Sequence, residues 1–465
     1  MIYLWAIIIY LIGLLLVGTW FYKKIEGSKS FMMADRGLPW WVNSGTMVAT
    51  YIGAGSLIGG SALAYKVGLS AVWMDAGGFL AVLALVFIAD KIRNFEGYST
   101  PDILGVRFNN ATRLVASLII IAAETAIVGY QMKAGGYVLN VAAGIDPKVG
   151  TIISAIFIIG YTMIAGLLSV AYTDLIQGVT IILSLLIGLP FVLQSAGGLS
   201  SFLSHVSPDK VNIFGGSFYD AMKVMFPTFC LVFVMQPLWQ RIFASKNIKE
   251  SRIAVIVSLP AIIFIVFVLV FTATVGAELF PGINGDSIIM HVAKNALPPL
   301  VGIIMLAAAV AIIVSTGDSM LLSPATNIIH DIYQTFINPK ADDRRVLLYT
   351  RLTVLILGLL AYIQVQFFPS ILAMVIYAYT MEGGLAPALI ASFFWKRATA
   401  AGGFACVLSA GIITIVWEAL KQPFGIGTVF PTIFISTAVL IIVSLLTPPP
   451  EESKLSRFFP DTFAS

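Results

Sequence analysis

The fold is decided by one stretch of sequence at residues 41–65, WVNSGTMVATYIGAGSLIGGSALAY. It is apolar enough and long enough to cross a lipid bilayer as a helix. Four glycines nevertheless lie near its middle, and each costs a helix ~1 kcal/mol relative to alanine: Gly53, Gly55, Gly59 and Gly60. Non-helical backbone inside hydrocarbon is tolerated only where it lines a cavity or is buried in protein. The stretch therefore predicts a transmembrane helix that is broken at its centre and exposes backbone oxygens to a small ion and a solute.

The same glycines have a simpler structural interpretation. Gly55 and Gly59 form a G-x-x-x-G pair, which often marks close helix packing and nothing more. A phosphate-binding loop is excluded, because the spacing is one residue off G-x-G-x-x-G and no strand precedes it. The choice between a broken helix and a closely packed helix depends on the rest of the chain.

The composition identifies the class of protein. The chain has 465 residues, of which 59% are hydrophobic and only 11% are charged. No water-soluble domain of that length could cover its surface with so few charges, so we expect an all-α polytopic membrane protein with one transmembrane domain over residues 1–465. The first apolar run, residues 2–22, has no basic segment before it and no small-residue cleavage site after it. We therefore interpret it as a span and not as a signal peptide.

The reactive side chains argue against an enzyme. Cys230 and Cys406 lie in apolar runs, and the three histidines are too far apart in the sequence to form a metal-ligand pattern: His205, His291 and His330. We find no pattern of a nucleophile with its base either. The net charge of +4 is attributed to cytoplasmic loops, so no nucleic-acid partner is expected.

Apolar runs of about 20 residues predict thirteen transmembrane spans. The ninth is too long for one crossing and is expected to include a flanking helix and a cytoplasmic extension. The spans lie near residues 2–22, 41–65, 69–90, 113–141, 149–166, 171–194, 217–243, 252–277, 298–333, 346–366, 370–395, 400–419 and 427–447.

The basic residues indicate the orientation of these spans. With the N-terminus outside and the C-terminus cytoplasmic, 20 of the 27 Lys and Arg residues fall in cytoplasmic segments, as the positive-inside rule requires. We therefore expect a multi-pass protein of the plasma (inner) membrane. The cytoplasmic residues are Lys23, Lys24, Lys29, Arg36, Lys91, Arg93, Arg107, Arg113, Arg241, Lys246, Lys249, Arg252, Lys340, Arg344, Arg345, Arg351, Lys396, Arg397, Lys454 and Arg457.

The spans also indicate a long internal repeat. Spans two to six (residues 41–194) and spans seven to eleven (residues 217–395) are each five helices, and an odd number inverts the second set. Span seven opens the second set and is interrupted by Pro227 and Pro237. Two broken helices at corresponding positions of inverted halves are typical of a transporter, although a proline alone often only kinks a membrane helix. The peripheral helices are 2–22, 400–419 and 427–447.

Ionisable side chains inside spans are costly and usually functional. Asp174 lies at the cytoplasmic start of span six, and Asp318 lies within span nine. Three hydroxyl side chains stand within about one helical turn of Asp318: Ser315, Thr316 and Ser319. Hydroxyl, carboxylate and carbonyl oxygens suit a hard monovalent cation such as Na⁺. The serines have an alternative, which is hydrogen bonding to the preceding turn of their own helix.

Seven residues are candidates for the walls of a solute pocket. Asp75 is expected near the external mouth of span three, where it faces solute or solvent. Trp239 has the alternative of an interfacial anchor, as tryptophans near span ends often do. The candidates are Tyr51, Ser56, Trp73, Asp75, Phe229, Gln236 and Trp239.

Four pieces of the sequence are similar to those of a known family. They are ATYIG (49–53), GLLSVAYTDLIQG (166–178), QPLWQRIFASKN (236–247) and VSTGDS (314–319). With them the chain resembles the sodium/solute symporter family, whose members carry proline, pantothenate, sugars, sialic acid, monocarboxylates or choline. The resemblance covers essentially the whole chain and implies a five-plus-five inverted repeat with two discontinuous helices.

The resemblance also implies where cations bind. The family's main sodium site, built from oxygens of spans two and nine, corresponds here to Ala49, Ile52, Ile312, Ser315 and Thr316. Some members have a second cation site, which corresponds to Asp174 and a serine near Ser319. This chain has Asp318 beside that serine, which leaves the second site open.

The expected function is sodium-coupled symport, the import of a small organic solute by alternating access. A small amino acid or organic carboxylate is favoured, with its charge met by Lys133 or by the N-terminus of a half-helix. Choline is disfavoured, because Tyr51 is a single candidate wall and span four near Ile127 offers no aromatic for a cage. A sugar is disfavoured because span two is poor in amides and hydroxyls.

Two other functions stay open. A proton-coupled carrier would exchange a proton at Asp174 or Asp318 in place of binding sodium. A non-transporting sensor with the same fold is the second. The lipid bilayer is an expected partner, and no oligomer is required for any of these functions.

Overall fold

The structure is a computed structural model that describes residues 2–22, 27–368 and 370–459. All regular secondary structure in these residues is helical, apart from one isolated β-bridge between Leu38 and Ser245. The all-α fold class is therefore confirmed. Lys23 and Lys24, which the orientation argument used, lie outside the described residues.

The first set of five spans forms in the predicted order. Its helices are α3 (Trp40–Tyr51), η2 (Gly55–Gly60), α4 (Ser61–Val67), α5 (Val72–Phe95), α7 (Asn110–Ala143) and α8 (Pro147–Ser195). Short segments precede or connect them: α2 (Ser28–Met33), η1 (Ala34–Arg36), η3 (Gly68–Ala71) and α6 (Thr100–Arg107).

The second set follows after two short connecting helices, α9 (Leu199–His205) and α10 (Pro208–Val211). Its helices are α11 (Phe218–Val234), α12 (Gln236–Ala244), α13 (Ile248–Leu279), α15 (Pro299–Thr326), η5 (Asn327–Ile337), α16 (Asp343–Gln364), α17 (Ile371–Gly383) and α18 (Ala386–Phe394). Between and beyond them lie η4 (Gly285–Ser287), α14 (Ile288–Asn295), η6 (Val365–Phe367), η7 (Pro423–Gly425) and α21 (Glu452–Leu455). The peripheral helices are α1 (Ile2–Tyr22), α19 (Ala400–Ala419) and α20 (Val429–Leu446).

The first broken helix is present. Helix α3 ends at Tyr51, Ile52 has an extended backbone (φ −79°, ψ 101°), and helical structure resumes at Gly55 in η2, a short π-helical segment. Gly53 lies within this break. A Cβ atom there would lie 2.6 Å from Gln131 Nε2, so a side chain would block the close approach of the broken backbone to α7.

Of the other glycines of the stretch, Gly55 allows close packing, whereas a Cβ atom at Gly59 would have its nearest neighbour at 3.7 Å. Gly55 and Gly59 lie inside η2, not in the break. A Cβ atom at Gly55 would meet the hydroxyl of Tyr379 on α17. Both interpretations of the glycine-rich stretch are therefore realised, a break at Gly53 and close packing at Gly55.

The second broken helix lies at residue 235. Helix α11 ends at Val234 and α12 begins at Gln236, with Met235 between them at φ −51° and ψ 105°. Pro237 lies in the first turn of α12, where its missing N–H removes no helical hydrogen bond. Pro227 lies inside the continuous helix α11, so the prediction that it also interrupts the span is wrong. A membrane helix tolerates such a proline without breaking.

Eleven helical stretches of the described chain are long and apolar enough to cross a membrane, compared with thirteen predicted spans. The difference arises because two of these stretches each contain parts of two predicted spans. Gly55–Phe95 joins the second half of the first broken helix to α5 through a turn at Gly68, which has φ +74°. Pro147–Ser195 contains both the fifth and the sixth predicted span.

Helix α8 turns back on itself at Gly166. A straight helix of 49 residues would be roughly 73 Å long, more than twice the ~30 Å hydrocarbon core. Gly166 instead has φ 61° and ψ 171°, a backbone conformation open almost only to glycine. The hydroxyls of Tyr161 and Thr173, on either side of it, lie 2.7 Å apart, whereas a straight helix would separate these residues by roughly 18 Å.

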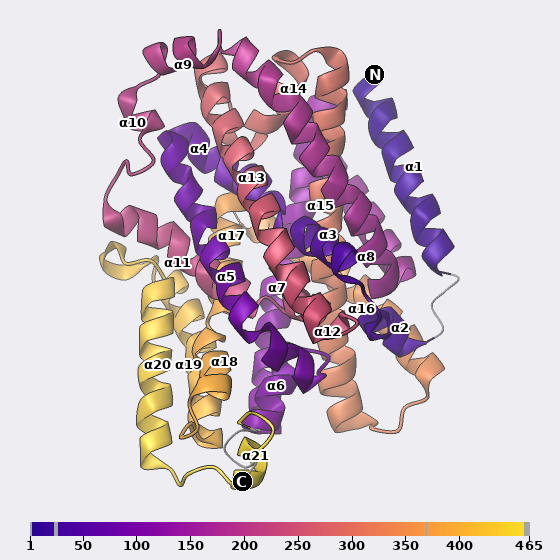
Figure 1. Ribbon diagram of the computed structural model, residues 1–465, viewed down its shortest axis with the longest axis vertical. Coiled ribbons are helices and arrows are strands. Elements are labelled where there is room, and N and C mark those ends of the chain that lie inside the picture. The colour runs from indigo at the N-terminus through magenta and orange to yellow at the C-terminus, as the bar shows by residue number, and fades with distance from the viewer. Residues whose placement is uncertain (1, 23–26, 369, 460–465) are drawn as a thin grey trace.

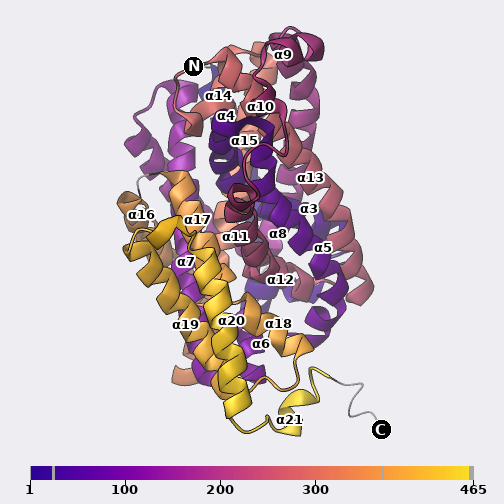
Figure 2. The same ribbon diagram turned by 90° about the vertical axis from the view of Figure 1, so that its left-hand side faces the viewer.

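Helix α15 lies in the middle of the bundle, where it packs against α3, α7 and α8 (Figure 1). It continues as η5, so the predicted extension of the ninth span is present, whereas the flanking helix α14 is a separate element. Helices α19 and α20 pack against each other at the side of the bundle (Figures 1 and 2).

The outer surface matches a lipid environment. Helix α1 packs against α8 and α15 and exposes a row of large apolar side chains, as expected of a lipid-facing helix: Ile2, Trp5, Ile9, Ile12 and Leu16. The start of α1 and the short helix α21 lie at opposite ends of the long axis in both views (Figures 1 and 2). This placement agrees with an odd number of crossings.

We predict that Gly166→Ala destabilises the protein by ~1–3 kcal/mol, because alanine resists the backbone conformation of Gly166. The new Cβ atom would also lie 2.6 Å from the Phe31 ring. Thermal unfolding of the purified protein measures the effect. Gly160→Ala is the matched control, since Gly160 lies in the same helix and a Cβ atom there has nothing within 4 Å. Equal melting temperatures for the two variants would contradict the predicted role of the turn.

Candidate functional site

The first broken helix meets α15 at its break. The Ser315 hydroxyl donates to the carbonyl oxygen of Ala49 at 2.9 Å. The Thr316 hydroxyl lies 3.0 Å from the carbonyl oxygen of Ile52 and 3.3 Å from that of Ala49. Two side chains of α15 therefore hold the carbonyl oxygens at the end of α3, where the helical hydrogen-bond pattern stops.

All five residues that the resemblance assigned to the main sodium site come together here. Ser315 also donates to the carbonyl of Ile312, at 3.2 Å, so the back-bonding expected of a membrane serine occurs beside the contact to Ala49. These residues are almost fully buried. The three carbonyl and two hydroxyl oxygens form a compact, uncharged, oxygen-only set, which is the donor chemistry that a hard monovalent cation prefers.

The three residues of the possible second cation site also lie together, but with an arginine among them. Arg241 Nη2 donates to Ser319 Oγ at 2.6 Å and lies 3.3 Å from Asp174 Oδ2. Ser319 Oγ in turn lies 3.3 Å from Asp318 Oδ1. The side chains of Arg241 and Asp174 are both fully buried. A positive charge of the protein itself thus stands between the groups that were expected to bind a cation.

The remaining contacts tie this cluster to the first broken helix. Asp174 Oδ2 accepts hydrogen bonds from the hydroxyls of Thr46 at 2.5 Å and Thr50 at 3.4 Å. Asp174 Oδ1 and Asp318 Oδ2 have no hydrogen-bond partner among the residues that the structure describes. A buried ion pair needs such additional hydrogen bonds to offset the cost of removing its charges from water, and here the helix α3 supplies them.

Arg241 corrects one step of the sequence interpretation. It was counted with the basic residues of a cytoplasmic loop, but it lies in α12, fully buried. A signal was present in the sequence, since Arg241 follows the helix break by six residues and the same chain carries unpaired acidic residues in two other spans. A buried cation is the ordinary partner of a buried carboxylate.

A small cavity of about 10 Å³ lies beside the first break, which is about the room that one water molecule needs. Asp75 is the ionisable carboxylate that lines this cavity, and its Oδ1 accepts a 2.7 Å hydrogen bond from Ser56 Oγ. No Lys or Arg within the described ranges forms an ion pair with Asp75. The lining residues are Thr50, Tyr51, Gly53, Ser56, Asp75, Tyr130, Thr228, Leu231, Val232, Met235, Thr316, Met320 and Tyr379.

Both helix breaks and α15 contribute to this cavity. Gly53 comes from the first break and Met235 from the second. Thr316 comes from α15, where it and Ser315 form what we call the hydroxyl pair. Of the predicted solute-pocket residues, the structure places three at the cavity: Tyr51, Ser56 and Asp75. Two further tyrosines line it that the sequence interpretation missed, Tyr130 and Tyr379.

The other four predicted wall residues lie outside the cavity. Trp73 donates from Nε1 to the carbonyl of Ile213 at 2.7 Å and borders a separate depression with Phe214. Phe229 stacks on Phe233, with ring centroids 6.2 Å apart.

Gln236 and Trp239 are buried structural residues. Gln236 Nε2 donates to Asn327 Oδ1 at 2.6 Å and to the carbonyl of Ser323 at 3.0 Å, which joins the second break to α15. Trp239 is fully buried, and its indole N–H donates to the carbonyl of Phe233 at 2.8 Å. It is therefore neither an interfacial anchor nor a cavity wall.

Lys133 does not approach the cavity. Its Nζ lies 3.5 Å from the carbonyl of Phe368, in a depression formed with Tyr137 and Lys148. Lys133 therefore lines a different depression from the one that contains Asp75. Gln131, two residues earlier on α7, instead accepts the backbone N–H of Ala54 at 3.0 Å and holds the break in place.

A family model described as "Sodium:solute symporter family" matches residues 31–410. The chain is 27% identical to the osmoregulated proline transporter OpuE of Bacillus subtilis (strain 168), over 97% of this chain and 96% of the relative. It is 25% identical to the high-affinity proline transporter PutP of the same organism, over 96% and 98% of the two chains. A sodium/proline symporter of Staphylococcus aureus (strain NCTC 8325 / PS 47) is also 25% identical, over 96% and 92%.

Two solved structures share the fold. A Na⁺-coupled sialic acid symporter in a substrate-bound, outward-open state has a TM-score of 0.85 and 21% identity, and the match covers 97% of this chain and 98% of that chain. Mhp1, a nucleobase-cation-symport-1 family transporter in a closed conformation, has a TM-score of 0.66 and 12% identity, with 92% and 97% covered. The inverted-repeat architecture with two discontinuous helices is thereby confirmed.

We predict that Arg241→Gln destabilises the protein by ~3–5 kcal/mol, because it leaves two buried carboxylates, Asp174 and Asp318, without a compensating charge. Adding Asp174→Asn should restore part of the lost stability. The measurement is thermal unfolding in detergent.

Arg252→Gln is the control for this prediction. Arg252 pairs with Asp90 at 2.7 Å, but its side chain is 50% exposed. Because solvent screens such a pair, the change should stay within ~1 kcal/mol. Wild-type stability of the Arg241→Gln variant would show that the buried pair has no structural role.

Proposed function

The chain belongs to the sodium:solute symporter family, and we propose that it imports a small solute with a protonated amine, an amino acid such as proline, together with one sodium ion. The observation that carries the proposal is the meeting of Ser315 and Thr316 with the carbonyl oxygens of Ala49 and Ile52. Sodium would bind among these oxygens, and the solute would bind at the adjoining cavity that contains Asp75, which has to widen to admit it.

The hydrogen bonds between α3 and α15 support a sodium site at this position. Each hydroxyl now directs its proton at a carbonyl oxygen. When sodium binds, each hydroxyl would rotate so that its oxygen faces the ion and its proton points elsewhere. The carbonyl oxygens would be further ligands. Since the ligands come from two helices, binding would hold the end of α3 against α15.

Thr316 couples the two sites. Its hydroxyl contacts the carbonyl of Ile52, and the same residue lines the solute cavity beside Gly53. Sodium at the hydroxyl would fix the cavity wall in the form that receives the solute. The membrane potential then contributes ~2.3 kcal/mol per sodium ion per 100 mV, and the sodium gradient adds to it.

The chemistry of the cavity supports an amine in the solute. Asp75 is buried and has no cationic partner in the part of the chain that is described. Three tyrosines surround the same space, namely Tyr51, Tyr130 and Tyr379. A carboxylate with aromatic walls suits an ammonium group, through charge and cation–π attraction. A carboxylic acid without an amine would instead place a second negative charge beside Asp75.

This cavity changes two expectations about the solute. Of the two classes favoured by the sequence, Asp75 supports amino acids, whose ammonium group it could pair with, over simple organic carboxylates. The reason for disfavouring choline no longer holds, because Tyr130 on α7 supplies the aromatic that the sequence interpretation did not find near Ile127. Proline is the first candidate, because the proline transporters OpuE and PutP align with this chain over nearly its whole length.

The proposed sodium stoichiometry is one. Arg241 Nη2 already contacts Ser319 and Asp174, two of the groups expected to form a second cation site. A guanidinium that contacts both groups would exclude a second sodium ion by charge and by volume. In this proposal the guanidinium of Arg241 takes the position that a second sodium ion has in some members of the family.

We also propose a membrane, an orientation and a domain division for the chain. We place the chain in the plasma membrane with the N-terminus outside and the C-terminus cytoplasmic. We also propose one transport domain with repeats at residues 41–194 and 217–395 and the other spans peripheral. The positive-inside pattern supports the orientation, with Arg241 removed from the count of loop residues.

A proton-coupled carrier is the second candidate. Asp174 Oδ1 and Asp318 Oδ2 have no hydrogen-bond partner in the described chain, and either carboxylate could take a proton there. Replacing external sodium with potassium at constant pH separates the two functions. Sodium coupling predicts that uptake stops, whereas proton coupling predicts that it continues. A sensor without transport predicts solute binding with no uptake under either condition.

We predict that Ser315→Ala combined with Thr316→Ala abolishes sodium-dependent uptake of labelled proline in membrane vesicles, with normal expression. Purified protein should also lose the rise in melting temperature that sodium produces, because a ligand stabilises only the form that binds it.

Thr326→Ala is the matched control for the hydroxyl pair. Thr326 lies in the same helix and is buried, and its hydroxyl donates to the carbonyl of Leu322 in the preceding turn. Its removal should leave sodium dependence unchanged. Sodium-dependent uptake by the double variant at wild-type sodium affinity would remove the proposed site.

We predict that Asp75→Asn weakens proline binding by ~10–100-fold, the effect expected when a hydrogen-bonded charge is lost. The sodium-induced thermal shift should persist, since Asp75 is not part of the hydroxyl pair. Asp209→Asn is the control, because Asp209 borders the outer depression beside Trp73 and not the cavity. A solute screen by thermal shift covers other amines, and tighter binding of amine-free carboxylates would overturn the assignment of the solute class.

A further inference from the structure

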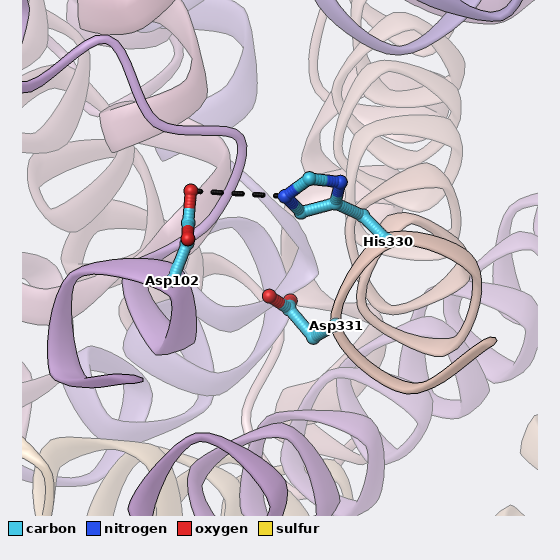
Figure 3. A group of neighbouring side chains, drawn as sticks. All are labelled: Asp102, His330 and Asp331. Carbon is cyan, nitrogen blue, oxygen red and sulfur yellow. Dashed lines mark ion pairs between the residues drawn. The ribbon is translucent and has the colours of Figure 1, made fainter. Parts of the chain in front are cut away.

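A second cluster of polar side chains lies away from both proposed transport sites. Asp102 is on α6, and His330 and Asp331 are on η5, the continuation of α15. One ligand atom from each of these residues lies within 4.8 Å of those from the other two. Figure 3 shows the three side chains directed into the same space from two separate elements. The sequence pattern did not reveal this cluster, because Asp102 lies far along the chain from His330 and Asp331.

The histidine ring is oriented by its neighbours. His330 Nδ1 lies 3.3 Å from Gln334 Oε1, one helical turn away, and so donates its proton there. The ring also stacks on Tyr98, with centroids 4.3 Å apart. The other ring nitrogen, Nε2, lies 3.7 Å from Asp102 Oδ2, and in the neutral ring it presents a lone pair toward that oxygen. Either a proton on Nε2 or a metal ion bound between the two groups makes this contact favourable.

Asp331 provides an independent observation. Its side chain is fully buried, and neither carboxylate oxygen has a hydrogen-bond partner among the residues described. Arg113 Nε lies 3.6 Å from Asp331 Oδ1, and Arg113 Nη2 bonds to Asp102 Oδ1. Arg113 therefore partly balances the two carboxylates and leaves Asp102 Oδ2 facing His330. With a neutral histidine, the four side chains carry a net charge of −1.

We propose that Asp102, His330 and Asp331 form a binding site for a divalent transition-metal ion, for which zinc is the probe. One imidazole nitrogen and two carboxylate oxygens are ligands that zinc accepts, and water completes the coordination. The hydrogen bond from Nδ1 to Gln334 is the kind of outer contact that fixes the tautomer of a metal-binding histidine. The side chains of His330 and Asp102 are 22% and 14% exposed, so an ion can reach them from solvent.

The position of the site suggests what the metal does. It would join α6 to η5, and η5 continues the helix that carries Ser315 and Thr316. An ion held by both elements resists their separation at this end of the bundle, which the proposed orientation makes cytoplasmic. Zinc on that side should therefore slow transport, a consequence that rests on the proposed function, whereas zinc binding itself does not.

The binding experiment is titration calorimetry of the purified full-length protein with zinc, in sodium-free buffer without solute. We expect about one zinc ion per chain. His330→Ala should abolish this binding, and Gln334→Leu should weaken it by ~10–100-fold while keeping all three ligands. Cobalt provides a spectroscopic check, since an imidazole–carboxylate site gives visible absorption bands that His330→Ala should remove.

His205→Ala is the matched control. His205 is exposed on α9 and lies far along the chain from the cluster, so its loss should leave zinc binding unchanged. Asp331→Asn adds a nearly isosteric test of the buried ligand. The site is overturned if the wild type binds no zinc in this ratio, or if His330→Ala binds zinc with wild-type affinity.

The transport experiment applies zinc separately to each side of proteoliposomes. We expect inhibition from the side where η5 ends and none in the His330→Ala variant. Unchanged uptake with zinc bound would overturn the inhibitory role. A protein that binds zinc but transports no solute under any condition would instead count against the proposed function, so the two failures are distinguishable.

Discussion

A backbone carbonyl inside hydrocarbon needs a partner, and this constraint organises the molecule. Where α3 ends at Tyr51, its last carbonyls leave the regular helical pattern and are met by hydroxyls of α15. Helix α15 must therefore lie against the break, in the middle of the bundle. The same contact creates a set of oxygens that fits sodium, so one solution to a structural problem also supplies the ion site.

Two buried carboxylates, Asp174 and Asp75, differ in whether a cationic side chain accompanies them. Near the hydroxyl pair, Asp174 is met by Arg241 and by hydroxyls from α3, so the protein supplies its own cation. In the cavity, Asp75 has a hydrogen bond from Ser56 and no cationic partner in the described residues. Asp174 is paired with a cationic side chain of the protein and belongs to the fold. Asp75 lacks such a partner within the described chain and is available to a cationic solute.

The candidate site was predicted in part, and the errors have physical causes. Trp239 and Gln236 follow the second break, but α12 turns both into the protein, where they bond to the carbonyl of Phe233 and to Asn327. Tyr130 was missed because α7 is buried over much of its surface, so its sequence gives no sign of which face meets the cavity. Arg241 was misplaced because a basic residue near a span end usually belongs to a loop.

By itself the sequence determined the class of protein and which two spans are broken. These properties depend on local features: the length of an apolar run, the low helix propensity of glycine, and the missing N–H of proline. Only the tertiary structure decided which oxygens meet at the break, that Arg241 pairs with Asp174, and that Asp102 faces His330. The hydroxyl of Ser315 and the carbonyl of Ala49 are 266 residues apart, and a contact of that range depends on how helices pack and not on any local pattern.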